Sequence, residues 1–329
     1  MEEKFIPQPF ARNPHLQTMF ANVKLRTMGR KMFFPDAAEM IMEGGNGARL
    51  LGYYSKHTRN ESRGLISIIH GWEGSSDSAY VVSTGYYLYK KGYDIFRLNL
   101  RDHGPSHHLN KGLFHGALLE ETFDVVARVA EFSPDKPYYL IGFSLGGNFA
   151  MRIALKHSTS ASAIPNLKHV FSISPALDPY KATLAIDRSL PVYRYYFLSK
   201  WKQSLKKKQR AFPEIYDFKE ALKLDTVLGI TEAIMCYYPD FSSYRDYFNQ
   251  YTLKAEMFSQ LEVPLTVIAS SDDPILPSED ILSLKESRHL RLSIQQYGGH
   301  CGFLHPFPFG CWYERKINDI LQHDVQERP

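Results

Sequence analysis

The feature that most constrains the fold of this chain is a serine set between glycines at a predicted junction of strand and helix. Residues 138–141 form a short apolar run, Gly142 and Ser144 follow, and Gly146 precedes a helix-like segment. This G-x-S-x-G spacing is typical of a cramped turn that lifts the serine hydroxyl above a sheet and points the next backbone N–H at an oxyanion. We expect Ser144 to be a nucleophile if a base, an acid and a second oxyanion donor lie at matching places.

Strand-like and helix-like segments alternate on both sides of this turn. The predicted strands are residues 32–34, 38–43, 49–54, 65–69, 93–98, 138–141, 170–173, 265–269 and 290–295, with a glycine-rich turn at 44–47. The predicted helices include residues 80–91, 117–132 and 145–157. Such alternation predicts an α/β fold, with a mainly parallel sheet and helices on both faces. In folds of this kind ligands bind at the carboxyl ends of the strands.

The pattern divides the chain into three parts. Residues 1–30 are rich in proline, asparagine and aromatic residues, and we expect them to form an irregular arm packed on the core. Residues 31–177 and 258–329 carry the alternating pattern and are expected to form the α/β core. Residues 178–257 have helical spacing, abundant aromatic and lysine residues and no clear strand, which predicts an inserted helical lid.

A serine hydroxyl needs a base that a third group holds in place. In this architecture the acid follows a late strand and the histidine follows the last one. His300, in a glycine-rich segment after the strand at 290–295, is the predicted base. Asp273 is the preferred acid because of its proline-linked turn after the strand at 265–269, with Asp272 and Asp178 as alternatives. Each aspartate could instead cap a helix or an Asx-turn.

The oxyanion donors are expected from two backbone N–H groups. The segment 70–74 reads H-G-x-x-G after the strand at 65–69, which is where the second donor should lie. We predict that the N–H groups of Trp72 and Leu145 form the hole, with side chains of little importance to it. His70 is expected to order this loop by hydrogen bonding rather than to act as a base.

With these residues in place, the sequence resembles the α/β-hydrolases over nearly its whole length. It also resembles a narrower group, the YheT-like hydrolases, because residues 13–18 read N-P-H-L-Q-T near the amino terminus. The resemblance implies an esterase-like serine hydrolase that acts on acyl esters, with some relatives acting on lipids.

Composition bounds the cellular setting and the partners. The formal net charge of +4 is weak for a nucleic-acid binder, so no nucleic-acid partner is expected. Three cysteines without a C-x-x-C pair argue against a disulfide framework or a cysteine zinc site. The amino terminus lacks the features of a secretory signal, and no apolar run is long enough to span a membrane. We expect a cytoplasmic protein without a cofactor or a metal.

Three further features have a functional and a structural interpretation. The histidines at 103, 107, 108 and 115 could bind a metal, but their spacing matches no standard ligand pair, so hydrogen bonds within a loop are preferred. Residues 197–210 combine an apolar stripe with six basic residues, which allows weak association with a lipid surface. An ordinary lid helix with solvated lysines is the preferred interpretation. Cys301 is expected to be a packing residue rather than a nucleophile.

The leading hypothesis is a hydrolase of carboxylic acyl esters that uses Ser144, His300 and Asp273 through an acyl-enzyme. An acyltransferase or thioesterase with the same residues is the first alternative. A non-catalytic lipid-binding protein is the second.

Overall fold

The computed structural model describes residues 3–23, 27, 37–57, 62–159, 163–305 and 310–326. Its centre is an eight-stranded sheet with the order β1-β2-β4-β3-β5-β6-β7-β8. Strands β1 and β2 form an antiparallel hairpin, β2 is antiparallel to β4, and every other neighbouring pair is parallel. The strands are β1 (Ala38–Glu43), β2 (Arg49–Ser55), β3 (Leu65–Ile69), β4 (Asp94–Leu98), β5 (Tyr138–Phe143), β6 (Leu167–Ile173), β7 (Leu265–Ser270) and β8 (Leu290–Gln295). The predicted α/β class with a mainly parallel sheet is confirmed; the predicted strand at 32–34 lies outside the described residues.

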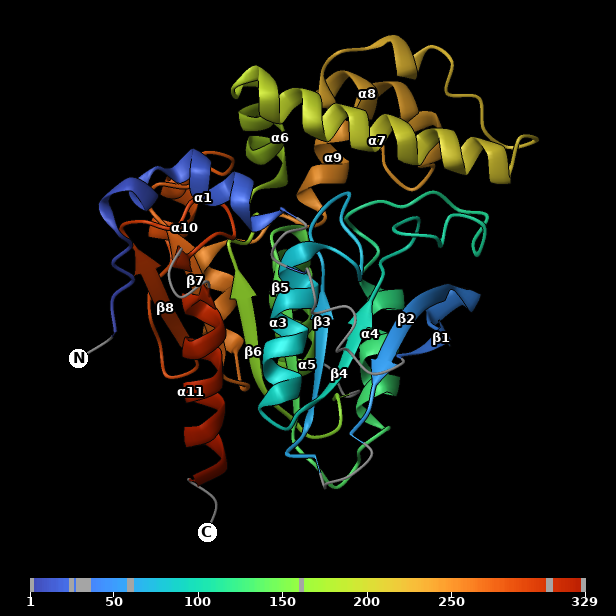
Figure 1. Cartoon of the computed structure of the whole chain (residues 1–329). Coiled ribbons are helices and arrows are strands. Elements are labelled where there is room, and N and C mark those ends of the chain that lie inside the picture. Colours follow the sequence, from blue (N-terminus) through green and yellow to red (C-terminus); the bar gives the residue numbers. More distant parts are fainter. Residues whose placement is uncertain are drawn as a thin grey trace.

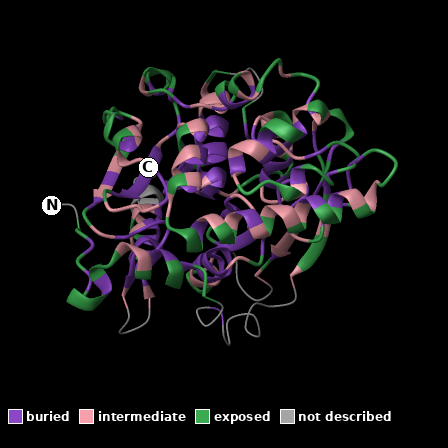
Figure 2. Ribbon diagram, turned by 90° about the horizontal axis from the view of Figure 1, so that it is seen from above, coloured by how far each residue is buried: buried purple, intermediate pink, exposed green. Residues whose placement is uncertain are grey.

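Helices cover both faces of this sheet (Figure 1). Helices α3 (Ala79–Lys90) and α11 (Trp312–Gln326) pack on one face, and α4 (Leu119–Ala130) and α5 (Leu145–Thr159) pack on the other. Strands β3, β4 and β5 are buried along their whole length, as expected for parallel strands between two helical layers. Seen from above, buried residues gather in the middle of the molecule and exposed ones along its rim (Figure 2).

Four helices lie between β6 and β7 in the chain and above the carboxyl ends of the strands (Figure 1). They are α6 (Pro179–Arg188), α7 (Pro191–Ala211), α8 (Val227–Ile234) and α9 (Tyr244–Asn249), joined by the 3-10 helices η4 (Ala221–Lys223), η5 (Met235–Tyr237) and η6 (Ala255–Gln260). Side chains from α6, α7 and α8 share an apolar cluster of their own. The helical spacing predicted for this stretch is therefore present, while its role as a lid stays a prediction.

The amino-terminal segment differs from the irregular arm that we expected. It contains the 3-10 helix η1 (Pro9–Arg12) and the helix α1 (Pro14–Ala21). Asn13 caps α1, because its side-chain oxygen accepts the N–H groups of His15 and Leu16, and Pro14 occupies the first helical position. An asparagine followed by proline is a strong signal for a helix start, so the sequence did carry the information.

Three smaller elements were also not predicted. They are α10 (Ser278–Leu282) and the short strands β9 (Leu304–His305) and β10 (Gly310–Cys311), which pair antiparallel. Within the described ranges, no helix combines the length and the apolar composition that a membrane crossing requires.

Candidate active site

Ser144 lies in a strained turn between β5 and α5. Its φ of 53° is in the left-handed region, which a serine seldom adopts. The turn is possible because both flanking glycines lie against backbone. A Cβ on Gly142 would come within 2.0 Å of the Gly146 carbonyl oxygen, and one on Gly146 within 2.4 Å of the His70 oxygen. The predicted strand-to-helix turn is therefore present, with the serine at its apex.

His300 follows β8 and contacts a carboxylate. Its Nδ1 lies 2.8 Å from Asp273 Oδ2, and both side chains are nearly buried. The other oxygen of Asp273 accepts the N–H groups of Ile275 and Leu276 at 2.8 and 3.0 Å, which fixes the carboxylate. Burial is the largest single influence and lowers the pKa of His300, but the charge and hydrogen bond of Asp273, together with the neighbouring Cys301, more than offset it. The pKa of His300 is therefore raised well above its ordinary value.

The two alternative aspartates have other contacts. Asp272 Oδ1 accepts the N–H of Gly299 at 2.9 Å, so this carboxylate supports the loop before His300. Asp178 caps α6 through the N–H of Lys181 and forms an ion pair with the Lys181 ammonium. Within the described residues, Asp273 is the one of the three candidates whose carboxylate contacts the His300 ring.

Ser144 and His300 line one cavity that opens to solvent and holds about 1100 Å³, including its open mouth. Gly71, Trp72 and Cys301 line it as well. A Cβ on Gly71 would lie 3.0 Å from the Ser144 Cβ, so the loop after β3 passes directly beside the serine. The elements expected to carry nucleophile, base and oxyanion donor therefore meet at the carboxyl ends of β3, β5 and β8.

The loop after β3 is held by its own hydrogen bonds. His70 accepts the N–H of Leu100 at 3.2 Å through Nε2, and its Nδ1 lies 2.7 Å from the Gly71 oxygen. These contacts agree with the ordering role expected for His70. The Tyr80 hydroxyl accepts the N–H of Gly71 at 3.0 Å. Within the described residues, no hydrogen bond is donated by the backbone N–H of Trp72 or Leu145, so both donors remain for a ligand.

The Trp72 side chain also has a role that the sequence did not suggest. It stacks on Phe197 with ring centroids 5.7 Å apart and meets Trp201 edge-on at 5.2 Å. The stripe expected at 197–210 therefore faces the loop after β3. The Trp72 ring links that loop to α7, and it lines the cavities on both sides of Ser144.

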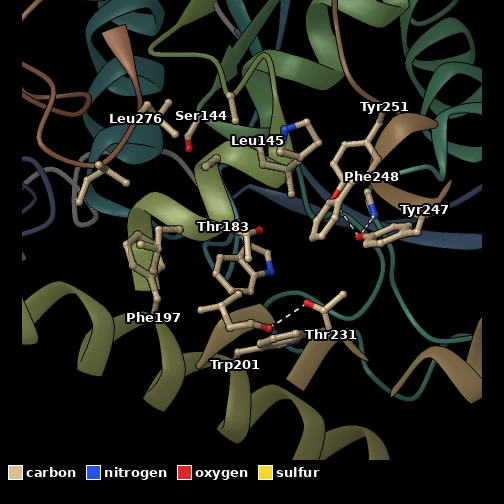
Figure 3. A pocket seen from close by; sticks show the side chains of 18 of the residues that line it. Ser144, Leu145, Thr183, Phe197, Trp201, Thr231, Tyr247, Phe248, Tyr251 and Leu276 are labelled. Atoms are coloured by element: carbon tan, nitrogen blue, oxygen red, sulfur yellow. Dashed lines mark hydrogen bonds between the residues drawn. The ribbon is translucent and has the colours of Figure 1, made fainter. Parts of the chain in front are cut away.

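A second cavity lies on the other side of Ser144 and is mainly apolar (Figure 3). It holds about 760 Å³, including its open mouth. Its wall comes from the elbow, from the inserted helices and from the loops after β4 and β7. The lining includes Leu145, Ala182, Ile186, Phe197, Trp201, Val227, Tyr247, Phe248, Tyr251 and Leu276. Ser144 thus stands between an apolar cavity and one that is lined with polar groups.

The histidine-rich loop after β4 is held by hydrogen bonds. His103 accepts the N–H of Glu73 at 3.2 Å, and His107 Nε2 lies 2.9 Å from Ser204 Oγ on α7. The His115 ring packs edge-on against Tyr238 at 5.3 Å. Burial lowers the pKa of His103 and His115 to about 4, which keeps both rings neutral. No cluster of three or more metal-binding side chains occurs within the described part of the chain.

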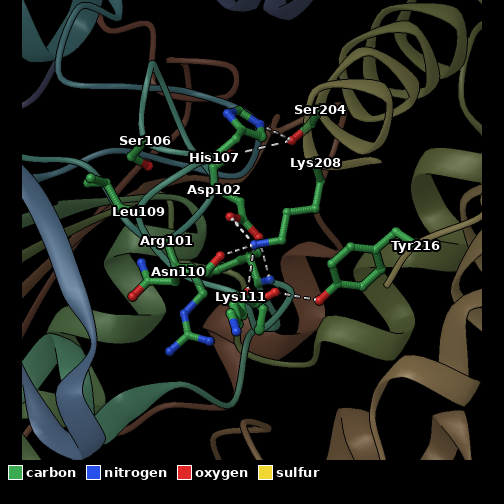
Figure 4. Close-up of polar contacts among 12 residues, drawn as sticks. Arg101, Asp102, Ser106, His107, Leu109, Asn110, Lys111, Ser204, Lys208 and Tyr216 are labelled. Carbon is green, nitrogen blue, oxygen red and sulfur yellow. Dashed lines mark hydrogen bonds and ion pairs between the residues drawn. The ribbon is translucent and has the colours of Figure 1, made fainter. Parts of the chain in front are cut away.

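One lysine of the basic stretch is not solvated, contrary to expectation. Lys208 is fully buried, and its ammonium donates to Asp102 Oδ1 at 2.8 Å and to the carbonyl oxygens of Asn110 and Gly112 at 2.7 and 2.8 Å (Figure 4). The loop after β4 thereby fastens α7. Local sequence could not reveal this, because the acceptors lie about a hundred residues away in the chain.

Two polar residues of α1 support the histidine loop, and sequence reasoning did not assign them. Thr18 Oγ accepts the backbone N–H of His300 at 2.9 Å and donates to the Pro14 oxygen. The Gln17 amide accepts the N–H of Leu304 at 2.8 Å and donates to its carbonyl oxygen at 3.1 Å. The N-P-H-L-Q-T segment was the available signal, since it places both residues on one side of a capped helix.

Cys301 is buried next to His300, with φ 60°. Its N–H donates to Ser174 Oγ at 3.2 Å. The residue packs against the end of β6, which agrees with the packing role expected from the sequence.

Comparison with known proteins relates this chain to a large fold family. The family model described as alpha/beta hydrolase fold matches residues 64–222. Phospholipase ABHD3 of Mus musculus is 23% identical over 275 residues, which cover 80% of this chain and 65% of that protein. Protein abhd-3.2 of Caenorhabditis elegans is 22% identical, and the match covers 85% of this chain and 76% of that protein. Monoacylglycerol lipase of Saccharomyces cerevisiae is 21% identical, and the match covers 85% of this chain and 65% of that protein. The chain thus spans about two thirds of the length of the mouse and yeast relatives.

Solved structures share the architecture. The Pyrococcus furiosus esterase Pf2001 superposes with a TM-score of 0.59 at 15% identity, covering 90% of this chain and 93% of that one. Est1E from Butyrivibrio proteoclasticus, solved with ferulic acid, superposes with a TM-score of 0.57 at 16% identity. The match covers 88% of this chain and 100% of that one. By its sheet, by the elbow at its centre and by these matches, the chain is a protein of the α/β-hydrolase fold.

Proposed function

We propose that this protein is a serine hydrolase that cleaves carboxylic acyl esters. The observation that carries the proposal is the contact of 2.8 Å between His300 Nδ1 and Asp273 Oδ2, with His300 lining the same cavity as Ser144. That contact leaves Nε2 as the ring nitrogen available to the serine, which supports the proposal of a Ser-His-Asp triad. The phospholipase and lipase names among the relatives support the same class of reaction.

In the proposed mechanism Ser144 Oγ attacks the ester carbonyl carbon while His300 Nε2 takes the serine proton. The N–H groups of Trp72 and Leu145 stabilise the oxyanion that forms. As the intermediate collapses, the bond to the alcohol breaks and the departing alkoxide takes the proton from His300. A water then attacks the acyl-enzyme, gives its proton to His300 and releases the acid, after which Ser144 regains that proton. Asp273 orients the ring and stabilises the imidazolium in both halves.

The two cavities suggest how the ester lies. The apolar one suits the acyl chain, because apolar side chains from α6, α7 and α9 line it. The polar one, lined by Asn22, Glu73 and Lys200 among others, suits the alcohol part. We take the inserted helices α6–α9 as the lid of this site. A lipid ester of short to medium acyl length is the substrate class that fits this division.

We also infer that the protein belongs to the YheT-like hydrolases. The N-P-H-L-Q-T segment at 13–18 supports this assignment, because its side chains hold the loop of the proposed base.

The test is hydrolysis of p-nitrophenyl esters of increasing chain length by wild type and Ser144→Ala. Wild type should prefer short to medium chains, with activity falling as the chain outgrows the apolar cavity. Ser144→Ala should lose at least about a thousandfold of that activity. Absent activity, or equal activity in both proteins, would contradict the proposal. Competition by added alcohols or thiols separates a hydrolase from an acyltransferase.

A further inference from the structure

Helix α1 is amphipathic, but its apolar side faces solvent. Leu16, Met19 and Phe20 of the helix and Val23, two residues beyond its end, follow the spacing i, i+3, i+4, i+7, and each is between 39% and 51% exposed. The polar Gln17 and Thr18, in contrast, are buried against the His300 loop. A helix on the surface of a globular protein ordinarily does the reverse. Among the described residues the stripe therefore has no partner, and its exposure is the consequence of the polar contacts on the other side of the helix.

The exposed apolar surface continues onto the start of α7. His15 Nδ1 of α1 lies 2.9 Å from the Tyr193 hydroxyl, and the two rings stack at 5.7 Å. On either side of Tyr193, exposed apolar side chains flank this contact; they are Leu190, Val192, Tyr195 and Tyr196. Contiguous exposed apolar surface of this kind marks an interaction site. We call these four residues and the stripe of α1 the outer apolar surface.

This surface borders the way into the proposed site. Asn22, next to the stripe, and Tyr196 on α7 both line the polar cavity that contains Ser144 and His300. A ligand that approaches over the outer apolar surface therefore arrives at the serine.

The charged residues on the two segments that form this surface are all basic. Residues 9–23 and 190–212 contain no aspartate or glutamate. Helix α7 carries seven basic residues, of which Lys208 is buried against Asp102. The other six are not buried; they are Arg194, Lys200, Lys202, Lys206, Lys207 and Arg210. Lys200 and Lys207 lie near Glu73. Exposed apolar side chains on segments that carry only basic charges complement an anionic lipid surface.

We propose that α1 and the start of α7 dock this protein on an anionic lipid surface. The apolar stripe enters the interfacial region of the bilayer, and the basic residues of α7 attract its headgroups. The outer apolar surface replaces the apolar stripe of residues 197–210 as the part that enters the bilayer, since Phe197, Trp201 and Leu205 pack inward. The basic residues of that stretch keep their expected role toward the headgroups. The proposal rests on the proposed function for its purpose, because an ester with an apolar acyl chain resides in such a surface. Docking itself needs no catalysis.

The experiment is flotation of the full chain with vesicles of phosphatidylcholine, with or without phosphatidylserine. Ser144→Ala is the background, so that no lipid is consumed. We expect co-flotation with the vesicles that contain phosphatidylserine and much less with phosphatidylcholine alone. Adding Leu16→Ser, Met19→Ser and Phe20→Ser should lower the bound fraction at least about tenfold. Lys206→Gln with Arg210→Gln should lower it several-fold on the anionic vesicles only.

The matched control is Ile41→Ser on the edge strand β1, which removes an equally exposed apolar side chain elsewhere and should leave flotation unchanged. When the native Ser144 is retained, the variant with Leu16→Ser, Met19→Ser and Phe20→Ser should still hydrolyse a water-soluble short-chain ester at the wild-type rate. This result would show that the variant is folded. No flotation with either vesicle, or equal flotation of the triple variant, would overturn the docking proposal. Flotation of a protein that hydrolyses no ester would instead contradict the proposed function alone.

Discussion

Two buried carboxylates, Asp273 and Asp102, make similar contacts and are suited to different tasks. Each lies after a parallel strand of the sheet, β7 or β4, and each contacts a nitrogen at 2.8 Å, in His300 or in Lys208. The Lys208 ammonium is saturated, because two carbonyl oxygens take its other donors. The His300 ring keeps its second nitrogen for Ser144 in the proposed mechanism. A saturated pair can only hold elements together, whereas a pair with an available nitrogen beside a cavity can transfer protons.

The largest effect is expected from Asp273→Asn. Because the amide cannot stabilise the imidazolium and favours the wrong tautomer, kcat/KM should fall roughly ten-thousandfold while the fold persists. Ester hydrolysis together with circular dichroism measures both. The matched control is Asp272→Asn, whose carboxylate contacts the Gly299 N–H rather than the ring and should cost far less. Equal losses of kcat/KM in the two variants would show that the contact of Asp273 with the His300 ring has no special role.

Lys208→Met should lower the free energy of unfolding. Removing one partner leaves Asp102 buried and uncompensated, which costs about 3–5 kcal/mol of unfolding free energy. Urea unfolding measures this, with the exposed Lys206→Met as the control. If the pair is purely structural, Asp102→Leu combined with Lys208→Met should recover much of the loss. A loss below about 1 kcal/mol for the single variant would show that the contact does not fasten α7.

Thr18→Val should test the support of the histidine loop. The change keeps the shape but removes the acceptor for the His300 N–H. An unsatisfied buried N–H costs about 1–3 kcal/mol, and we expect kcat to fall about tenfold with little change in KM. Thr18→Ser should restore it, since the hydroxyl returns. Thr159→Val, which removes a similar helical hydroxyl at the far end of α5, should leave kcat unchanged. A rise in KM alone would assign Thr18 to binding instead.

The smallest expected effect is a shift in pH dependence. His300 must be neutral to accept the serine proton, and its raised pKa keeps the ring protonated to higher pH. Activity should therefore fall as the pH decreases through a value above 6.5, the ordinary pKa of histidine. In Asp273→Asn, the residual activity should fall only at a lower pH than in wild type. The carboxylate that raises the pKa of His300 is absent from this variant. An unchanged pH profile in Asp273→Asn would show that Asp273 does not influence the group whose titration controls activity.

The parts of the fold with strong local signals were predictable from the sequence. Strands such as β3 and β5 are short apolar runs bounded by turn residues, and the elbow at Ser144 needs glycines at fixed spacing. His300 and Asp273 were proposed from their order after late strands, and the contact between them agrees with that expectation.

What the sequence could not provide depends on contacts between distant segments. Lys208 resembles its exposed neighbours, and only the fold shows that Asn110 and Gly112 surround its ammonium. Thr18 contacts His300 across more than 280 residues of chain. Helix α1 was missed for a different reason: its apolar stripe and its Asn13 cap were visible, but the density of proline and aromatic residues suggested an irregular segment.

The central claim is that His300 and Asp273 activate Ser144 as a nucleophile. Labelling with a fluorophosphonate probe, followed by mass spectrometry of the peptides, tests it most directly. We expect one adduct per chain on Ser144, absent from Ser144→Ala and formed far more slowly in His300→Ala, while Lys206→Met labels like wild type. No adduct on the wild-type protein, an adduct that persists in Ser144→Ala, or one on Cys301 would contradict it.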